Sequence, residues 1–228
     1  MYDADRIVSH QKTSKQILVE AFDYEKALIC PKSKASVFYY KRKLNVSNFN
    51  VVDEGRYEST CYVDDVSIAA KGPNEVGSFV VDFIDRKVKG EIKEFRLYSD
   101  NCFAQNKNRG LSAALLHVAA KNDIKIRHRY LEKGHTYNGA GTTYSLTERK
   151  ARPREIYTPE QWYDIIATSK RSKTNPINVV RVDRTMVLDW KSLAEKLNLD
   201  KDVDGKPIPW QKLQEITYDG SSPYELSF

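Results

Sequence analysis

The chain has 228 residues, of which 40% are hydrophobic, so it can bury the core of one large domain or of one domain with an appendage. The polar N-terminus predicts no signal peptide, and no apolar run is long enough for a membrane span. The 3 widely spaced cysteines contain no CxxC pair, so they suggest neither a disulfide framework nor a zinc site. The net charge of +6 favours a polyanionic partner, and we expect an intracellular, nuclear protein without a membrane partner.

The first elements are three predicted strands. Residues 15–28 form the first, with alternating apolar residues before Phe22 and Asp23. The aromatic segment 37–44 and the segment 60–63 are β-prone, and a polar turn at 54–56 separates them. Three strands in succession predict an antiparallel meander.

The periodicity then changes to that of helices alternating with strands. Apolar residues at helical spacing predict a helix over 76–84 and another over 108–120, with a strand at 95–99 between them. A loop at 134–139 and a short helix at 142–150 follow.

A further strand is predicted at residues 124–130, where apolar and basic side chains alternate. The basic residues of this strand are Lys125, Arg127 and Arg129. Three basic side chains on one strand face are typical of a solvated or partner-binding surface and not of a core.

This order of elements predicts an α/β fold with a ribonuclease H-like mixed sheet: three antiparallel strands, then alternating helix and strand. We assign residues 1–152 to this core and residues 153–228 to a C-terminal α+β extension packed on it. The extension begins with a helix, because Thr158, Pro159 and Gln161 form a capping box with proline in the first turn.

Carboxylates follow two of the predicted central strands. Asp100 ends the strand at 95–99, where it could cap the next helix or bind a metal, and Asp23 ends the first strand. The two strands are neighbours in a ribonuclease H-like sheet, so these acids should meet and could share one ion. Metal-assisted phosphodiester chemistry usually needs a third carboxylate. The loop after residue 134 offers none until Glu148, about 10 Å along the helix from position 141.

Several segments resemble a family of insect transposase-like domains of uncharacterised function, of the DDE/D type with a ribonuclease H-like fold. The more specific blocks are residues 97–108 and 134–149, and weaker ones stand in order at residues 22–23, 38–44, 48–49 and 72–75.

The resemblance implies that Asp23 and Asp100 are ligands for Mg²⁺ or Mn²⁺. Members of the family carry an acid where this chain has Gly141 and a histidine where it has Tyr144. Their Trp-Asp-Glu segment reads Asp-Asp-Val at residues 64–66. The chain therefore resembles a degenerate or domesticated copy that keeps the fold and the DNA-binding surface but has impaired catalysis.

Candidate contacts to nucleic acid are basic residues distributed along the chain, together with one loop histidine. They are Lys41, Arg42, Lys43, Lys107, Arg109, Arg127, Arg129, His135, Arg149, Lys150, Arg152 and Arg154. Two other functions remain open. The chain could be an active Mg²⁺-dependent nuclease in which Glu148, Glu132 or another acid completes the site. It could also be a catalytically dead scaffold for protein interactions.

Overall fold

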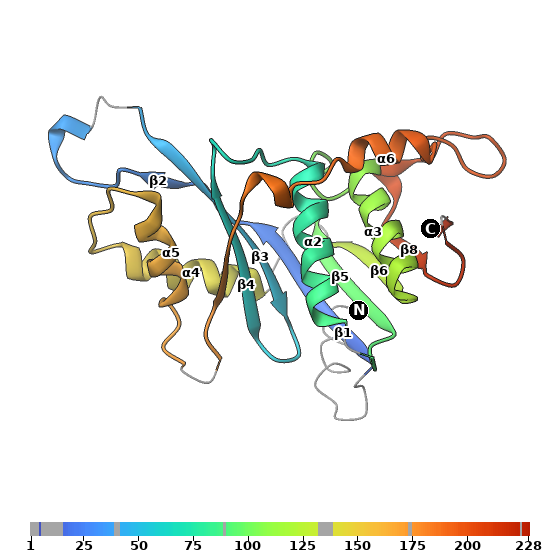
Figure 1. Cartoon of the computed structure of the whole chain (residues 1–228), viewed down its shortest axis with the longest axis horizontal. Coiled ribbons are helices and arrows are strands. Elements are labelled where there is room, and N and C mark those ends of the chain that lie inside the picture. Colours follow the sequence, from blue (N-terminus) through green and yellow to red (C-terminus); the bar gives the residue numbers. More distant parts are fainter. Residues whose placement is uncertain are drawn as a thin grey trace.

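The computed structural model describes residues 5, 16–38, 42–88, 90–131, 139–172, 175–223 and 225–228. In these residues the protein is a mixed α/β structure with five α-helices and one nine-stranded mixed sheet. The strand order is β7-β4-β3-β1-β5-β6-β8-β9, and β2 pairs with β3 beside this row (Figure 1).

The predicted antiparallel meander is present. Its strands are β1 (Ile17–Tyr24), β3 (Leu44–Asp53) and β4 (Glu58–Asp65), and the short β2 (Leu28–Cys30) pairs with the start of β3. On its other side β1 lies parallel to β5 (Glu94–Asp100), which is parallel to β6 (Lys125–Leu131).

The prediction of a strand at 37–44 is wrong in the described part of that segment, and residues 39–41 lie outside the described residues. Residues Ser36–Phe38 form a short 3₁₀ helix, η1, and β3 begins only at Leu44. β3 contains the polar residues Ser47, Asn48 and Asn50, which lower its intrinsic β-propensity. Hydrogen bonding to both β1 and β4 outweighs that propensity, so tertiary pairing decides where the strand lies.

Two helical layers cover opposite faces of the sheet. Helices α2 (Pro73–Lys87) and α3 (Arg109–Asn122), crossing in front of the sheet in Figure 1, pack with the short α6 (Trp190–Lys196) on a core that includes Phe49. Helix α5 (Pro159–Ala167) and the end of α4 (Gly139–Ala151) pack on a second core that includes Val46. Residues 46 and 49 point to opposite faces because side chains alternate along a strand.

The C-terminal part of the chain extends the sheet at both ends. β7 (Asn178–Arg181) adds parallel to β4, β8 (Glu215–Asp219) adds antiparallel to β6, and β9 (Leu226–Ser227) pairs with β8. The predicted helix start is confirmed, since Gln161 accepts a hydrogen bond from the Thr158 N–H at 3.2 Å. The domain boundary at residue 152 stays a prediction.

Helices long and apolar enough to cross a membrane are absent from the residues described.

Candidate acidic site at the carboxyl edge of the sheet

Asp23 and Asp100 end two adjacent central strands, as predicted. β1 and β5 pair in parallel with Ala21 opposite Tyr98. The same register continued by two residues places Asp23 opposite Asp100. Both side chains share the face of Ala21 and Tyr98, because alternate residues of a strand point the same way. The helix that meets β1 on this face is α4: its Tyr144 hydroxyl donates to the Asp23 carbonyl oxygen.

The two carboxylates influence each other electrostatically. Burial raises the pKa of Asp23 to about 6, and the negative charge of Asp100 adds to the rise. The hydrogen bond from the Tyr24 N–H to Asp23 Oδ1, 2.7 Å long, acts in the opposite direction. Partial desolvation and a like charge nearby both favour the neutral form of a carboxyl group and so raise its pKa.

Asp100 does not cap the helix that follows it. The N-cap of α3 is Asn108, whose side-chain oxygen accepts from the Leu111 N–H at 3.0 Å. Asp100 Oδ1 instead accepts from the Cys102 N–H at 3.1 Å and from the Asn106 amide. Asp100 therefore fixes the loop at 101–108 and keeps its place at the edge of the sheet.

Asn50 is a polar residue of this site that the sequence analysis did not single out. It lies opposite Asp23 in the β1–β3 pair and is fully buried. Neither its side-chain nitrogen nor its side-chain oxygen has a hydrogen-bond partner in the described part of the chain. A buried amide without partners costs about 1–3 kcal/mol. The sequence signal that could have identified Asn50 is a polar residue in the middle of a central strand.

Position 141, where the resemblance implies an acid in related chains, is open. Gly141 lies in the first turn of α4, and a Cβ built there meets no atom within 4 Å. Residues three apart share one side of a helix, so position 141 lies above the same strand as Tyr144. Residues 132–138, which include Glu132 and His135, lie outside the described residues.

The charge of Glu148 acts on Glu25, the residue that follows β1. Burial is the main cause that raises the pKa of Glu25 to about 7, and the charge of Glu148 contributes. Glu25 also accepts a hydrogen bond of 2.7 Å from the Asn48 amide. Across the described residues, no group of three or more His, Cys, Asp or Glu side chains could hold a metal.

The basic face of β6 differs from the solvated surface expected, because its charges are paired. The partners are Asp219 for Lys125 at 3.1 Å, Glu94 for Arg127 at 3.4 Å, and Glu215 with Asp5 for Arg129. Only 15% of the Arg129 side chain is exposed. These acids come from other parts of the chain, so the strand pattern alone could not show them.

Lys107 is buried and structural, contrary to its assignment as a phosphate contact. It is 2% exposed, and its ammonium group donates to Asn101 Oδ1 at 3.0 Å and to the Gln211 carbonyl at 3.1 Å. The same group lies 4.8 Å from the centre of the Tyr130 ring. Arg109 is exposed but forms an ion pair with Asp200.

The remaining basic candidates keep their charge at the surface. Lys150 donates to the Thr168 carbonyl. The exposed residues are Arg42, Lys43, Arg149, Arg152 and Arg154, and Lys41 lies outside the described residues.

Comparison with known proteins places the chain in a family. Residues 41–201 match the model of DUF7869, a domain of unknown function, so the chain belongs to that family. No curated protein matches the chain. A solved structure of Ciona intestinalis endonuclease V in complex with a 23mer DNA is similar at 12% identity over 90% of this chain and 89% of that chain. Its TM-score of 0.21 does not establish a shared fold.

Proposed function

We propose that the protein is a transposon-derived, nucleic-acid-binding domain of the DDE/D type with a ribonuclease H-like core and impaired catalysis. The observation that carries the proposal is the pair Asp23 and Asp100, in register on adjacent parallel strands and on one face. Helix α4 meets the same face and carries Gly141, where this class of site needs its third acid.

The donor set suits one divalent cation. The two carboxylates are hard oxygen ligands of the kind that Mg²⁺ and Mn²⁺ prefer, and the unpartnered amide of Asn50 offers a further oxygen beside Asp23. A bound ion would polarise a phosphate oxygen of the substrate. A second ion would need a carboxylate from α4, which Gly141 cannot supply. The residues of this chain therefore favour binding of nucleic acid over cleavage of its phosphodiester bonds.

The exposed arginines at the end of α4 are the best placed phosphate contacts. Lys32 donates its ammonium hydrogen bonds to the carbonyls of Ala151, Arg152 and Arg154, at 2.8, 3.2 and 2.8 Å. The backbone here is thus fixed, while the guanidinium groups of Arg152 and Arg154 extend into solvent. Fixed cations at a surface release condensed counterions when they neutralise phosphates.

The test is a DNA-binding titration at several salt concentrations. We expect weak, sequence-tolerant binding whose log–log salt slope is about −0.9 for each phosphate neutralised. No binding, or binding with a flat slope, would remove nucleic acid from the function and favour a protein-interaction scaffold.

A second candidate function is an active nuclease that uses a substitute acid. It is favoured by the charge of Glu148 on α4, which contributes to the raised pKa of Glu25 just after β1. The test is nicking of supercoiled plasmid in Mn²⁺. Robust nicking that Asp100→Ala abolishes would establish this function in place of the impaired one.

A further inference from the structure

A cavity of about 240 Å³ lies beside the loop that follows Asp100. It is bounded by the N-terminal ends of α2 and α3, by α6, and by the 3₁₀ helix η3 (Trp210–Lys212). Asp100 ends β5 and the chain then turns back into α3, so the cavity opens at the same edge of the sheet as the acidic site. The acids face α4, whereas the cavity lies on the side of α2 and α3.

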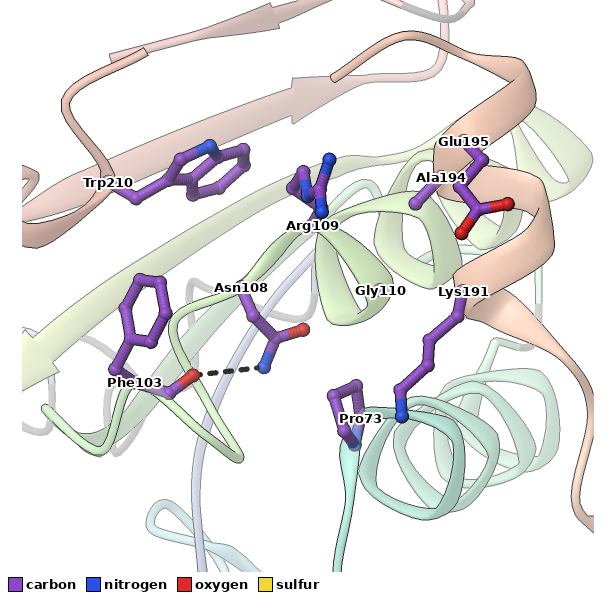
Figure 2. A pocket seen from close by; sticks show the side chains of 9 residues that line it. All are labelled: Pro73, Phe103, Asn108, Arg109, Gly110, Lys191, Ala194, Glu195 and Trp210. Carbon is purple, nitrogen blue, oxygen red and sulfur yellow. Dashed lines mark hydrogen bonds between the residues drawn. The ribbon is translucent and has the colours of Figure 1, made fainter. Parts of the chain in front are cut away.

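Two aromatic rings line this cavity. Phe103 leaves 51% of its surface exposed, which is unusual for a phenylalanine that only fills a core, and Trp210 is half-buried. Figure 2 shows both rings on one side of the cavity and the side chains of α6 on the other. The Trp210 indole nitrogen has no hydrogen-bond partner in the described residues.

The aromatic walls are tied to the acidic site by two hydrogen-bonded links. Asp100 holds the loop of Phe103 through the Cys102 N–H and the Asn106 amide. Lys107, in the same loop, donates to the carbonyl of Gln211, the residue after Trp210. A ligand stacked in the cavity would therefore lie at a fixed position relative to Asp100.

The charges around the cavity suit a ligand that is both aromatic and anionic. Lys191 and Arg109 line it. The Lys191 ammonium has no ion-pair partner among the residues the structure describes, and Arg109 pairs with Asp200 at the surface, where such pairs contribute about 0–1 kcal/mol and exchange readily. The carboxylate of Glu195 on the same wall could accept a hydrogen bond from an exocyclic amino group.

We infer that this cavity receives one unpaired nucleobase of the bound strand, stacked on Phe103 and Trp210, with the adjoining phosphate at Lys191 and Arg109. Aromatic platforms beside cations are the general means by which proteins hold unpaired nucleotides. The inference rests on the proposed nucleic-acid binding and specifies which part of the nucleic acid reaches the edge of Asp100. The cavity admits a single base and not a base pair.

The test uses a single-stranded oligonucleotide with a central 2-aminopurine, whose fluorescence falls when the base stacks. We expect quenching with the wild-type chain. Phe103→Leu keeps the apolar bulk but removes one of the two rings, so it should reduce the quenching and weaken single-strand binding about 5- to 150-fold. Tyr57→Leu is the matched control, because Tyr57 is 53% exposed in the β3–β4 turn at the opposite edge of the sheet. It should change neither quantity.

Duplex DNA of the same sequence separates this inference from the proposed function. If duplex binds with a steep salt slope but the single strand shows no quenching, or if Phe103→Leu and Tyr57→Leu behave alike, the base pocket is wrong and the function stands. If neither nucleic acid binds, both fail. Lys191→Met should weaken single-strand binding and lower the salt slope by about 0.7, the value for one phosphate of a single strand.

Discussion

The acidic site of Asp23, Asn50 and Asp100 and the basic strand β6 use polar residues in opposite ways. On β6 every basic residue of the expected open face has an acid partner. At the acidic site, Asp23 is crowded by Asp100, and the buried amide of Asn50 has no partner in the described residues. The charges of β6 stabilise the fold, while the acidic site retains polar groups that stability alone does not explain.

The comparison also shows that a basic residue in the sequence is not necessarily available to bind a ligand. Arg129 and Arg152 look equivalent along the chain, yet Arg129 is enclosed by carboxylates and Arg152 is exposed. Partly strained or unsatisfied polar groups concentrate at functional sites, whereas saturated pairs are structural.

The largest loss of stability is expected when an ion pair of β6 is removed. Arg129→Met leaves Glu215 without its cation and leaves Asp5, which is 9% exposed at its side chain, with Arg96 as its remaining ion-pair partner. Removing one partner of a largely buried pair costs about 3–5 kcal/mol. Lys125→Met removes an exposed pair and should cost about 1 kcal/mol or less. Urea denaturation of both variants measures the difference; equal losses would show that β6 carries no structural network.

A second effect concerns Asp64, which ends β4 at the same edge of the sheet. Burial, with smaller contributions from Asp65 and Glu75 and opposition from Lys71, raises its pKa from the usual 3.8 to about 7. The folded protein thus holds this proton more tightly than the unfolded chain, so its stability falls as the pH rises from about 4 through about 7.

Asp64→Asn should remove that dependence. We expect a gain in the free energy of unfolding of up to about 4 kcal/mol at pH 8 and little change at pH 4, measured by urea denaturation at both values. Asp65→Asn is the neighbouring control and should show no comparable gain. A pH-independent effect of Asp64→Asn would mean that this carboxyl is already ionised in the folded protein.

The sequence predicted the central elements better than the partners of its polar residues. β1, β4, β5, α2 and α3 follow from apolar periodicity, which burial enforces directly, and so does the adjacency of Asp23 and Asp100. β3 was misplaced because its polar residues hide a strand that pairs on both sides. Lys107 was misjudged because its acceptor at Gln211 lies 104 residues away.

A smaller effect distinguishes exposed from paired arginines in DNA binding. Changing Arg152 and Arg154 together to serine should reduce the magnitude of the salt slope by about 0.9 for each lost phosphate contact. Arg127→Ser should leave the slope unchanged, since its guanidinium pairs with Glu94. A larger loss from Arg127→Ser than from the double variant would place the DNA on β6 instead.

Titration calorimetry with Mn²⁺ tests the central account most directly, because it measures the acidic site without requiring activity. The wild type should bind one ion weakly, and Asp100→Asn should abolish that binding. Gly141→Asp should bind Mn²⁺ at least about tenfold more tightly, since position 141 is open and a third carboxylate completes the ligands. Gly141→Asn, of equal size without the charge, should gain much less. Equal affinities for the aspartate and asparagine variants, or wild-type binding that survives Asp100→Asn, would contradict a two-acid site that lacks its third ligand.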